Sequence, residues 1–193
     1  DQGSNSHFEL FLEKDGKHYS DFTPQPSEVF SESSVLIRVN NQSALDYEIT
    51  YQLTFQIIAR EKDTAEHRSS TAMVTVNILN VNDNEPIFDS DSYNATVKEN
   101  SQNGTHVAWM QARDADLGEF GKLTYSVRGS NDRFVINATT GEVLVNGELD
   151  REKVDKYFLT VEAKDGGGFR TPVELEVTIL DENDNPPLFR RTE

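Results

Sequence analysis

Acidic side chains separated by one residue occur as two pairs in the second half of the chain. Asp114 and Asp116 flank an Ala, and Asp150 and Glu152 flank an Arg. Side chains two residues apart on an extended backbone point to the same side, so both carboxylates of a pair can reach one ion. Ca²⁺ takes about 6 to 8 oxygen ligands at about 2.3 to 2.6 Å. The pairs predict cation binding, although a single Asp-x-Asp is more often a turn.

Two eleven-residue segments of nearly identical sequence contain further candidate ligands. Ile78 to Phe88 reads ILNVNDNEPIF, and Ile179 to Phe189 reads ILDENDNPPLF. Each ends an apolar run with Asn and Asp, residues that supply carboxylate, amide and backbone oxygens. Because these groups recur in two copies within a chain of net charge -16, we favour ion binding over ordinary turns.

The similarity between the two halves of the chain extends well beyond these eleven-residue segments. Asp46-Tyr47-Glu48 precedes Asp150-Arg151-Glu152 by 104 residues, and Ala59 precedes Ala163 by the same distance. The two Asn-Asp-Asn triplets, in contrast, are 101 residues apart, which places three extra residues in the polar stretch KDTAEHRSS of the first copy. The chain is therefore expected to contain two copies of one module.

The elements that must position these carboxylates are predicted to be strands. Runs such as LTFQIIA, YFLTVEA and VELEVTIL are apolar at every second position or rich in β-branched residues, and Gly, Asn, Asp and Pro separate them. About seven short strands in about 100 residues indicate an all-β fold of tandem Greek-key, immunoglobulin-like sandwiches. We place the two domains at residues 1–86 and 87–193, joined without a flexible spacer.

The first copy is expected to be incomplete at its N-terminal end. Phe8-Glu9-Leu10 resembles Phe134-Val135-Ile136, yet only seven residues precede Phe8. The first strands of the copy then have no sequence to form them, which predicts a chain that begins inside a repeat. The longer interval between Phe8 and Asp46 also predicts an inserted loop around HYSDFTPQPSEVFSESS.

Composition excludes several partners. The 34 acidic residues against 18 basic ones argue against nucleic acid and anionic lipid, which require a basic surface. No run approaches the about 20 apolar residues that span a bilayer, and no leader opens the chain, so an anchor or signal peptide would lie outside it. Four sequons favour an extracellular, glycosylated protein; their acceptors are Asn41, Asn94, Asn103 and Asn137.

Taken in order, the motifs of the second copy resemble the extracellular repeat of the cadherin superfamily. They are VKEN from Val97, ARDAD from Ala112, LDRE from Leu149, AKDG from Ala163 and the closing DENDNPPLF. The resemblance covers about 100 residues. It implies a large non-classical cadherin or a protocadherin-like protein, in which Ca²⁺ lies between consecutive repeats and draws ligands from both.

The resemblance also implies two sets of ligands. The set for the junction inside the chain is Asp46, Glu48, Asn80, Asn82, Asp83, Asn84, Asp114, Asp116 and Asp165. The set for the following junction is Glu99, Asp150, Glu152, Asp181, Asn183, Asp184 and Asn185. Asn80 departs from the family pattern, which has an Asp here, as at Asp181; the amide still offers an oxygen, but the site loses one negative charge.

Three classes of function remain to be compared. The favoured one is a calcium-dependent extracellular adhesion or tether module, soluble as this chain but anchored to the plasma membrane in its parent, whose partners are adjacent repeats and other cadherin ectodomains. The alternative is a heterophilic receptor or ligand-presenting ectodomain in which these repeats are spacers. An enzyme is not expected, because the chain has no Cys and no GxSxG, HExxH or phosphate-loop pattern.

Overall fold

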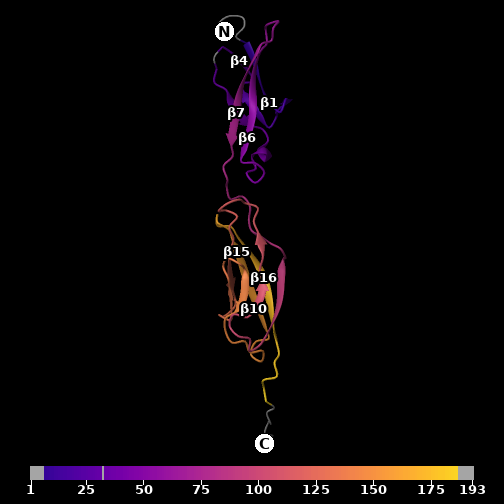
Figure 1. Cartoon of the computed structure of the whole chain (residues 1–193), viewed down its shortest axis with the longest axis vertical. Helices are drawn as coiled ribbons and strands as arrows, with labels where there is room; N and C mark the ends of the chain where they lie inside the picture. The colour runs from indigo at the N-terminus through magenta and orange to yellow at the C-terminus, as the bar shows by residue number, and fades with distance from the viewer. Residues whose placement is uncertain (1–6, 32, 187–193) are drawn as a thin grey trace. The chain divides into compact units, whose positions relative to one another are not determined.

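The computed structural model describes residues 7–31 and 33–186, and the chain divides into two compact units, Asp1–Val81 (unit 1) and Asn82–Glu193 (unit 2). Apart from one 3₁₀ turn, η1 (Gln42–Leu45), the regular structure of the described residues is entirely β (Figure 1), which confirms the all-β prediction. No helix in these residues has the length and apolarity to cross a membrane. The last three residues of the second eleven-residue segment, 187–189, lie outside the described residues.

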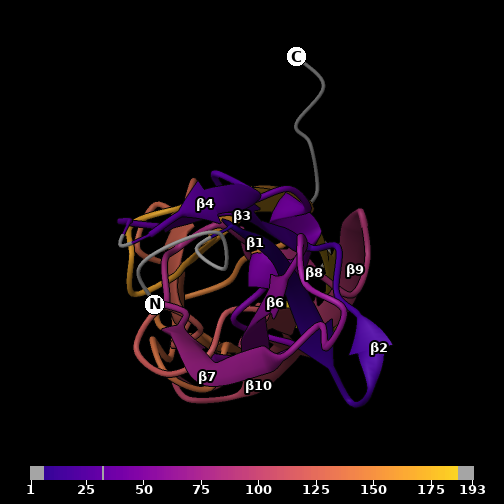
Figure 2. The same ribbon diagram turned by 90° about the horizontal axis from the view of Figure 1, so that it is seen from above.

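Unit 1 is built on a sheet in which β1 and β6 are central. The strands are β1 (His7–Lys14), β2 (Lys17–His18), β3 (Phe22–Gln25), β4 (Glu28–Phe30), β5 (Leu36–Val39), β6 (Gln52–Glu61) and β7 (Ser69–Asn77). The sheet has the order β2-β1-β6-β7, β4 also pairs with β1, and β3 pairs with β5 in a second small sheet. Figure 2 shows β4 and β7 on opposite sides of β1 and β6.

The core of unit 1 lies between these two sheets. Alternation along β6 turns Leu53 and Phe55 inward, and both are buried. They pack with Leu12 of β1 and Phe22 of β3, and the rings of Phe22 and Phe55 stack with centroids 5.0 Å apart. Successive side chains of a strand point to opposite faces. A sequence of period two therefore folds as strands, because its apolar residues then all lie on the face that leaves water.

The pairing of β1 corrects one sequence alignment. Phe8-Glu9-Leu10 was expected to match Phe134-Val135-Ile136, but β1 pairs antiparallel with β6, with Leu10 opposite Ala59. In unit 2 the corresponding partner of Ala163 is Tyr125. The strand that matches Phe134 begins at Phe22, which is equally buried. The prediction failed because short apolar triplets are alike in every strand, and only the hydrogen-bond register separates them.

Unit 2 contains two facing sheets and a short ribbon. Its strands are β8 (Ile87–Phe88), β9 (Ser92–Lys98), β10 (His106–Trp109), β11 (Ala112–Arg113), β12 (Thr124–Arg128), β13 (Phe134–Ile136), β14 (Glu142–Val145), β15 (Lys156–Lys164) and β16 (Arg170–Leu180). The sheets have the orders β12-β15-β16-β9 and β10-β14-β13, and β8 pairs with β11. Strands β15 and β16 alternate strictly, and their inward residues Leu159, Val161, Leu175 and Val177 are at most 1% exposed.

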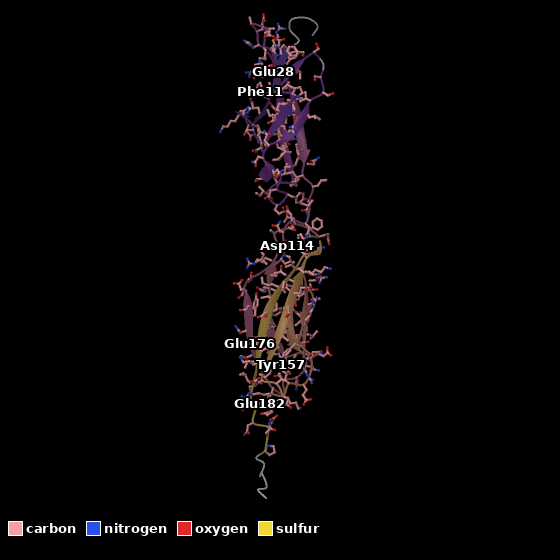
Figure 3. The ribbon with its side chains drawn as sticks, turned by 180° about the vertical axis from the view of Figure 1, so that it is seen from behind. Phe11, Glu28, Asp114, Tyr157, Glu176 and Glu182 are labelled. Carbon is pink, nitrogen blue, oxygen red and sulfur yellow. The ribbon has the colours of Figure 1, made fainter. Side chains whose placement is uncertain are left out.

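Two strands of unit 2 fix where its ends lie. β9 and β16 pair in parallel over seven residue pairs, from Ser92 opposite Glu174 to Lys98 opposite Leu180. Both strands therefore run from the end that carries Asp165, just before β16, to the end that carries Glu99, just after β9. Figure 3 shows Asp114 and Glu182 at opposite ends of this unit.

The predicted three-residue insertion lies in the loop between β6 and β7. The last pair of these strands is Arg60 with Ser69, whereas the last pair of β15 and β16 is Lys164 with Arg170. Eight residues separate the first pair along the chain and five separate the second. The loop is longer by three residues, as the spacing predicted.

Candidate metal centre

One end of unit 2, which we call the Asp114 end, gathers Asp114, Asp116 and Asp165. One carboxylate oxygen from each lies within 4.8 Å of the other two. Asp116 and Asp165 are only 4% and 3% exposed. Asp114 and Asp116 follow β11, and Asp165 follows β15, so loops at the same end of two sheets bring them together.

Asn82 to Asn84, the start of unit 2, complete this end. The side-chain amide of Asn84 donates to Asp83 Oδ1 (3.0 Å) and to Asp116 Oδ1 (2.9 Å), and its backbone N–H donates to Asp116 Oδ2 (3.3 Å). The sequence predicted Asn84 as a carbonyl ligand and missed this bridging amide. The amide of Asn84 thereby joins the carboxylates of Asp83 and Asp116, which come from different loops.

Several oxygens at this end have no hydrogen-bond donor among the described residues. Asp114 Oδ2, Asp165 Oδ2 and Asn82 Oδ1 are buried without a hydrogen-bond partner. A buried polar group left in this state costs about 1 to 3 kcal/mol. Oxygens of carboxylates and amides are the ligands of Ca²⁺, so the donor set and the missing donors both fit a bound hard cation.

The titration of these carboxyls reflects the same crowding. Burial raises the pKa of Asp114, and the negative charges of Asp116 and Asp165 add to that rise, while a hydrogen bond from the N–H of Asp116 opposes it. Burial also acts to raise the pKa of Asp165. Hydrogen bonds from the Asn82 side chain and from the N–H groups of Gly168 and Phe169 outweigh that effect and leave the pKa lowered.

The triple glycine after Asp165 has a packing function. A Cβ on Gly167 would overlap the side chain of Asn82, and one on Gly166 would overlap the carbonyl oxygen of Glu119. The bare backbone lets the Asn82 side chain reach Asp165 and lets the loop turn its N–H groups of Gly168 and Phe169 onto Asp165 Oδ1. A Gly run alone cannot indicate such a contact, because it is equally typical of a flexible turn.

The opposite end of unit 2, the Glu99 end, gathers Glu99, Asp150 and Glu152, again with one oxygen of each within 4.8 Å of the others. Glu99 is 1% exposed. Its Oε1 accepts from the N–H of Glu182 (2.7 Å) and its Oε2 from the N–H of Arg151 (2.8 Å). These two N–H groups lower the pKa of Glu99.

The closing motif lies against this end. Asp184 Oδ2 accepts from the amide of Asn100 (2.6 Å), and Asp184 Oδ1 accepts from the amide of Asn185 (2.7 Å). Asp181 forms an ion pair with Arg151. Among the described residues the side chain of Asn183 has no hydrogen-bond partner, and it does not belong to the carboxylate cluster. The Asn185 to Asp184 hydrogen bond repeats that of Asn84 to Asp83.

Three predicted ligands belong to unit 1. Asp46 follows η1, and its Oδ1 accepts from the N–H of Ile49 (3.0 Å). Glu48 lies in the same turn, and Asn80 follows β7. Of the four sequon acceptors, all are exposed: Asn94 on β9, Asn103 and Asn137 in turns, and Asn41 as the N-cap of η1.

Comparison with known proteins identifies the module. The cadherin domain family matches residues 93–180. Over 192 residues, 98% of the chain, it is 39% identical to cadherin-related family member 1 of Xenopus laevis. The chain contains a cadherin domain and is homologous to cadherin-related proteins. It spans only 22% of the length of that relative, and 6% of rat cadherin-23, to which it is 36% identical over 191 residues.

Solved cadherin structures have the same fold. Mouse cadherin-23 EC22-24 superposes with a TM-score of 0.79 at 32% identity, covering 95% of this chain and 57% of that one. The cis-dimer structure of protocadherin gammaB7 EC3-6 superposes at 0.75 and 27% identity, covering all of this chain and 47% of that one. Cadherin repeats are not catalytic domains, which confirms that the chain is not an enzyme.

Proposed function

We propose that this cadherin chain is a calcium-dependent adhesion or tether module of an extracellular ectodomain. The observation that carries the proposal is the Asp114 end of unit 2, where buried oxygens of Asp114 and Asp165 have no donor within the described residues. A divalent cation would neutralise three carboxylates that otherwise repel one another. Ca²⁺ affinity typical of extracellular modules is about 10⁻⁴ to 10⁻³ M.

The remaining ligands of this end stay a prediction from the sequence. Asp46, Glu48 and Asn80 of unit 1 are expected to add oxygens, and Ca²⁺ would then stiffen the segment around Val81 that joins the repeats. The four exposed sequon acceptors support an extracellular place for the chain. Another cadherin ectodomain is the expected partner, supported by the cis-dimer formed by the related protocadherin.

Calorimetric titration with CaCl₂ tests the proposal. Asp165→Asn keeps the shape of the side chain but removes one charge, and Asp83→Ala removes a linker carboxylate; both are expected to weaken binding at least tenfold or abolish it. Asp91→Asn, at an exposed residue before β9, is the matched control and should titrate like the wild type. Wild-type affinity in Asp165→Asn would refute the Asp114 end as the calcium site. Asp184→Ala is expected to have a smaller effect than Asp83→Ala.

A further inference from the structure

The two ends of unit 2 differ in what neutralises their carboxylates. At the Asp114 end Arg113 and Lys122 pair elsewhere, with Asp89 and Glu119, and Lys164, next to Asp165, forms no ion pair with a described acidic residue. The Glu99 end has cations of its own. Lys153 Nζ lies 2.6 Å from Asp150 Oδ2, and Arg151 Nη1 lies 3.3 Å from Asp181 Oδ1.

A single residue, Lys153, occupies both oxygens of Asp150. Its ammonium contacts Oδ2, and its backbone N–H donates to Oδ1 at 3.0 Å. The Glu99 carboxylate is occupied as well, by the N–H groups of Arg151 and Glu182. A cation that binds here must therefore share these oxygens with donors that the protein already supplies. The backbone N–H groups cannot leave without moving the loops, whereas the Lys153 side chain can.

The position of Lys153 makes displacement easy. Its side chain is 73% exposed, so water screens the ion pair and leaves it weak. Lys153 and Asp150 line a hollow together with Glu148 and Arg133. Glu148 offers the ammonium a second carboxylate, and Arg133 repels it. The ammonium can therefore leave Asp150 without losing every acidic neighbour.

We propose that Lys153 is a built-in competitor of Ca²⁺ at the Glu99 end: its ammonium occupies Asp150 in the absence of the divalent cation and weakens the affinity of this end. The inference rests on the proposed calcium-binding function and adds a regulating residue to it. Neither the acidic pattern of the sequence nor the family match points to Lys153, because a Lys after LDRE looks like an ordinary solvated charge.

The test is a CaCl₂ titration of the full chain followed by residue-resolved ¹⁵N NMR. The amides of Arg151 and Glu182, which donate to Glu99, report on one end, and those of Asp116 and Gly168 report on the other. In Lys153→Gln the apparent Kd at the Glu99 end is expected to fall about 1.5- to 5-fold, the range for an exposed ion pair. The Kd at the Asp114 end should stay unchanged.

Two variants separate competition from a general charge effect. Lys156→Gln removes the same charge from the same unit, but its ammonium pairs with Glu176, so this variant should titrate like the wild type. Lys153→Arg keeps a cation beside Asp150 and should keep the wild-type Kd. If Lys153→Gln behaves like Lys156→Gln, or if Arg does not restore the wild-type value, the competitor is refuted. Failure of the wild type to titrate at either end would overturn the proposed function as well.

Discussion

Strands β7 of unit 1 and β16 of unit 2 carry apolar residues in the same register but bury them very differently. Val76 lies opposite Leu53, and Val177 lies opposite Tyr157 at the equivalent place. Val177 is 0% exposed, whereas Val76 is only partly buried. In unit 2 the neighbour β9 covers the edge of β16. Within the described residues β7 pairs with β6 alone.

The two units protect opposite edges of a similar sheet. Unit 1 covers the far edge, β1, with β2 and β4, while the equivalent strand of unit 2, β12, pairs only with β15 in the described part of the chain. Edge strands are usually blunted by charged residues or Pro. β7 (SSTAMVTVN) has neither. The equivalent pairs β6–β7 and β15–β16 thus have opposite edges of their sheets exposed. How deeply a residue is buried depends on neighbouring strands, which the sequence of its own strand does not specify.

The largest expected effect is on the matched valines. Val177→Ala removes buried methyl groups and leaves a cavity, which should lower the free energy of unfolding of unit 2 by about 2 to 3 kcal/mol. Val76→Ala at the equivalent position should cost unit 1 less than about 1 kcal/mol, because water already reaches the side chain. Urea denaturation measures both, with the single Trp109 as the probe of unit 2. Equal losses would contradict the comparison.

Hydrogen exchange should show the same contrast along the backbone. Amides of β16 bond to β15 on one side and β9 on the other, so both alternating sets are protected. Amides of β7 that face away from β6 have no such partner among the described residues and should exchange at least tenfold faster than the other set of the same strand. Uniform protection along β7 would mean that another segment covers its edge.

A smaller effect is expected at Gly167. In Gly167→Ala the new Cβ displaces the Asn82 side chain, and Asp165 loses one hydrogen bond, which should cost unit 2 about 0.5 to 1.5 kcal/mol. Thermal unfolding of unit 2 measures the loss. Thr64→Ala is the counterpart in unit 1, since Thr64 Oγ1 donates to Glu61, the residue that matches Asp165, at 2.7 Å. A loss of stability in Gly167→Ala without any change at the amide groups that donate to Asp165 would argue against the contact between Asn82 and Asp165.

The smallest effect concerns the edge that only unit 1 covers. When protonated, His7 donates to Asp63 (2.8 Å) and to Glu28 (3.1 Å); its ring stacks on Phe30, and it shares Glu28 with Lys62. Asp63 and then Glu28 raise the pKa of His7. The pairing of β4 with β1 is therefore fully stabilised below about pH 6.5 and weakens as pH rises through the raised pKa.

Exchange of the Leu10 amide, which donates to Ser27 at 2.7 Å, measures this weakening. After correction for intrinsic exchange, its protection should decline slightly between about pH 6 and pH 8 in the wild type. His7→Gln, which does not titrate, should show no decline. A pH-dependent loss that persists in the variant would remove His7 from the explanation.

Much of the fold followed from the sequence because period-two alternation and the internal repeat are local signals. The offset of 101 and 104 residues located the loop insertion correctly. Spacing paired Asp114 with Asp116, and the resemblance to cadherin repeats added Asp165; the three carboxylates do converge. The alignment of Phe8 failed because it needed the register of β1 against β6. Whether the unit 1 ligands join the Asp114 end stays a prediction.

The donors that occupy the carboxylates could not be predicted. Glu99 is held by backbone N–H groups of Arg151 and Glu182, whose contacts depend on how two loops approach and not on side-chain type. Gly167 is required by the closeness of Asn82, which is far away in sequence. The sequence named the acids, but the geometry decides which of them already have a donor.

The parallel ladder of β9 and β16 has a mechanical consequence. Both strands run in the same direction through unit 2, and their seven paired positions lie between the entry of the chain at Ser92 and its exit at Leu180. A pulling force applied at these two points acts along the strands, so the pairs are loaded together in shear and cannot be unzipped one after another. Unit 2 should therefore resist stretching more strongly than its free energy of unfolding alone would indicate.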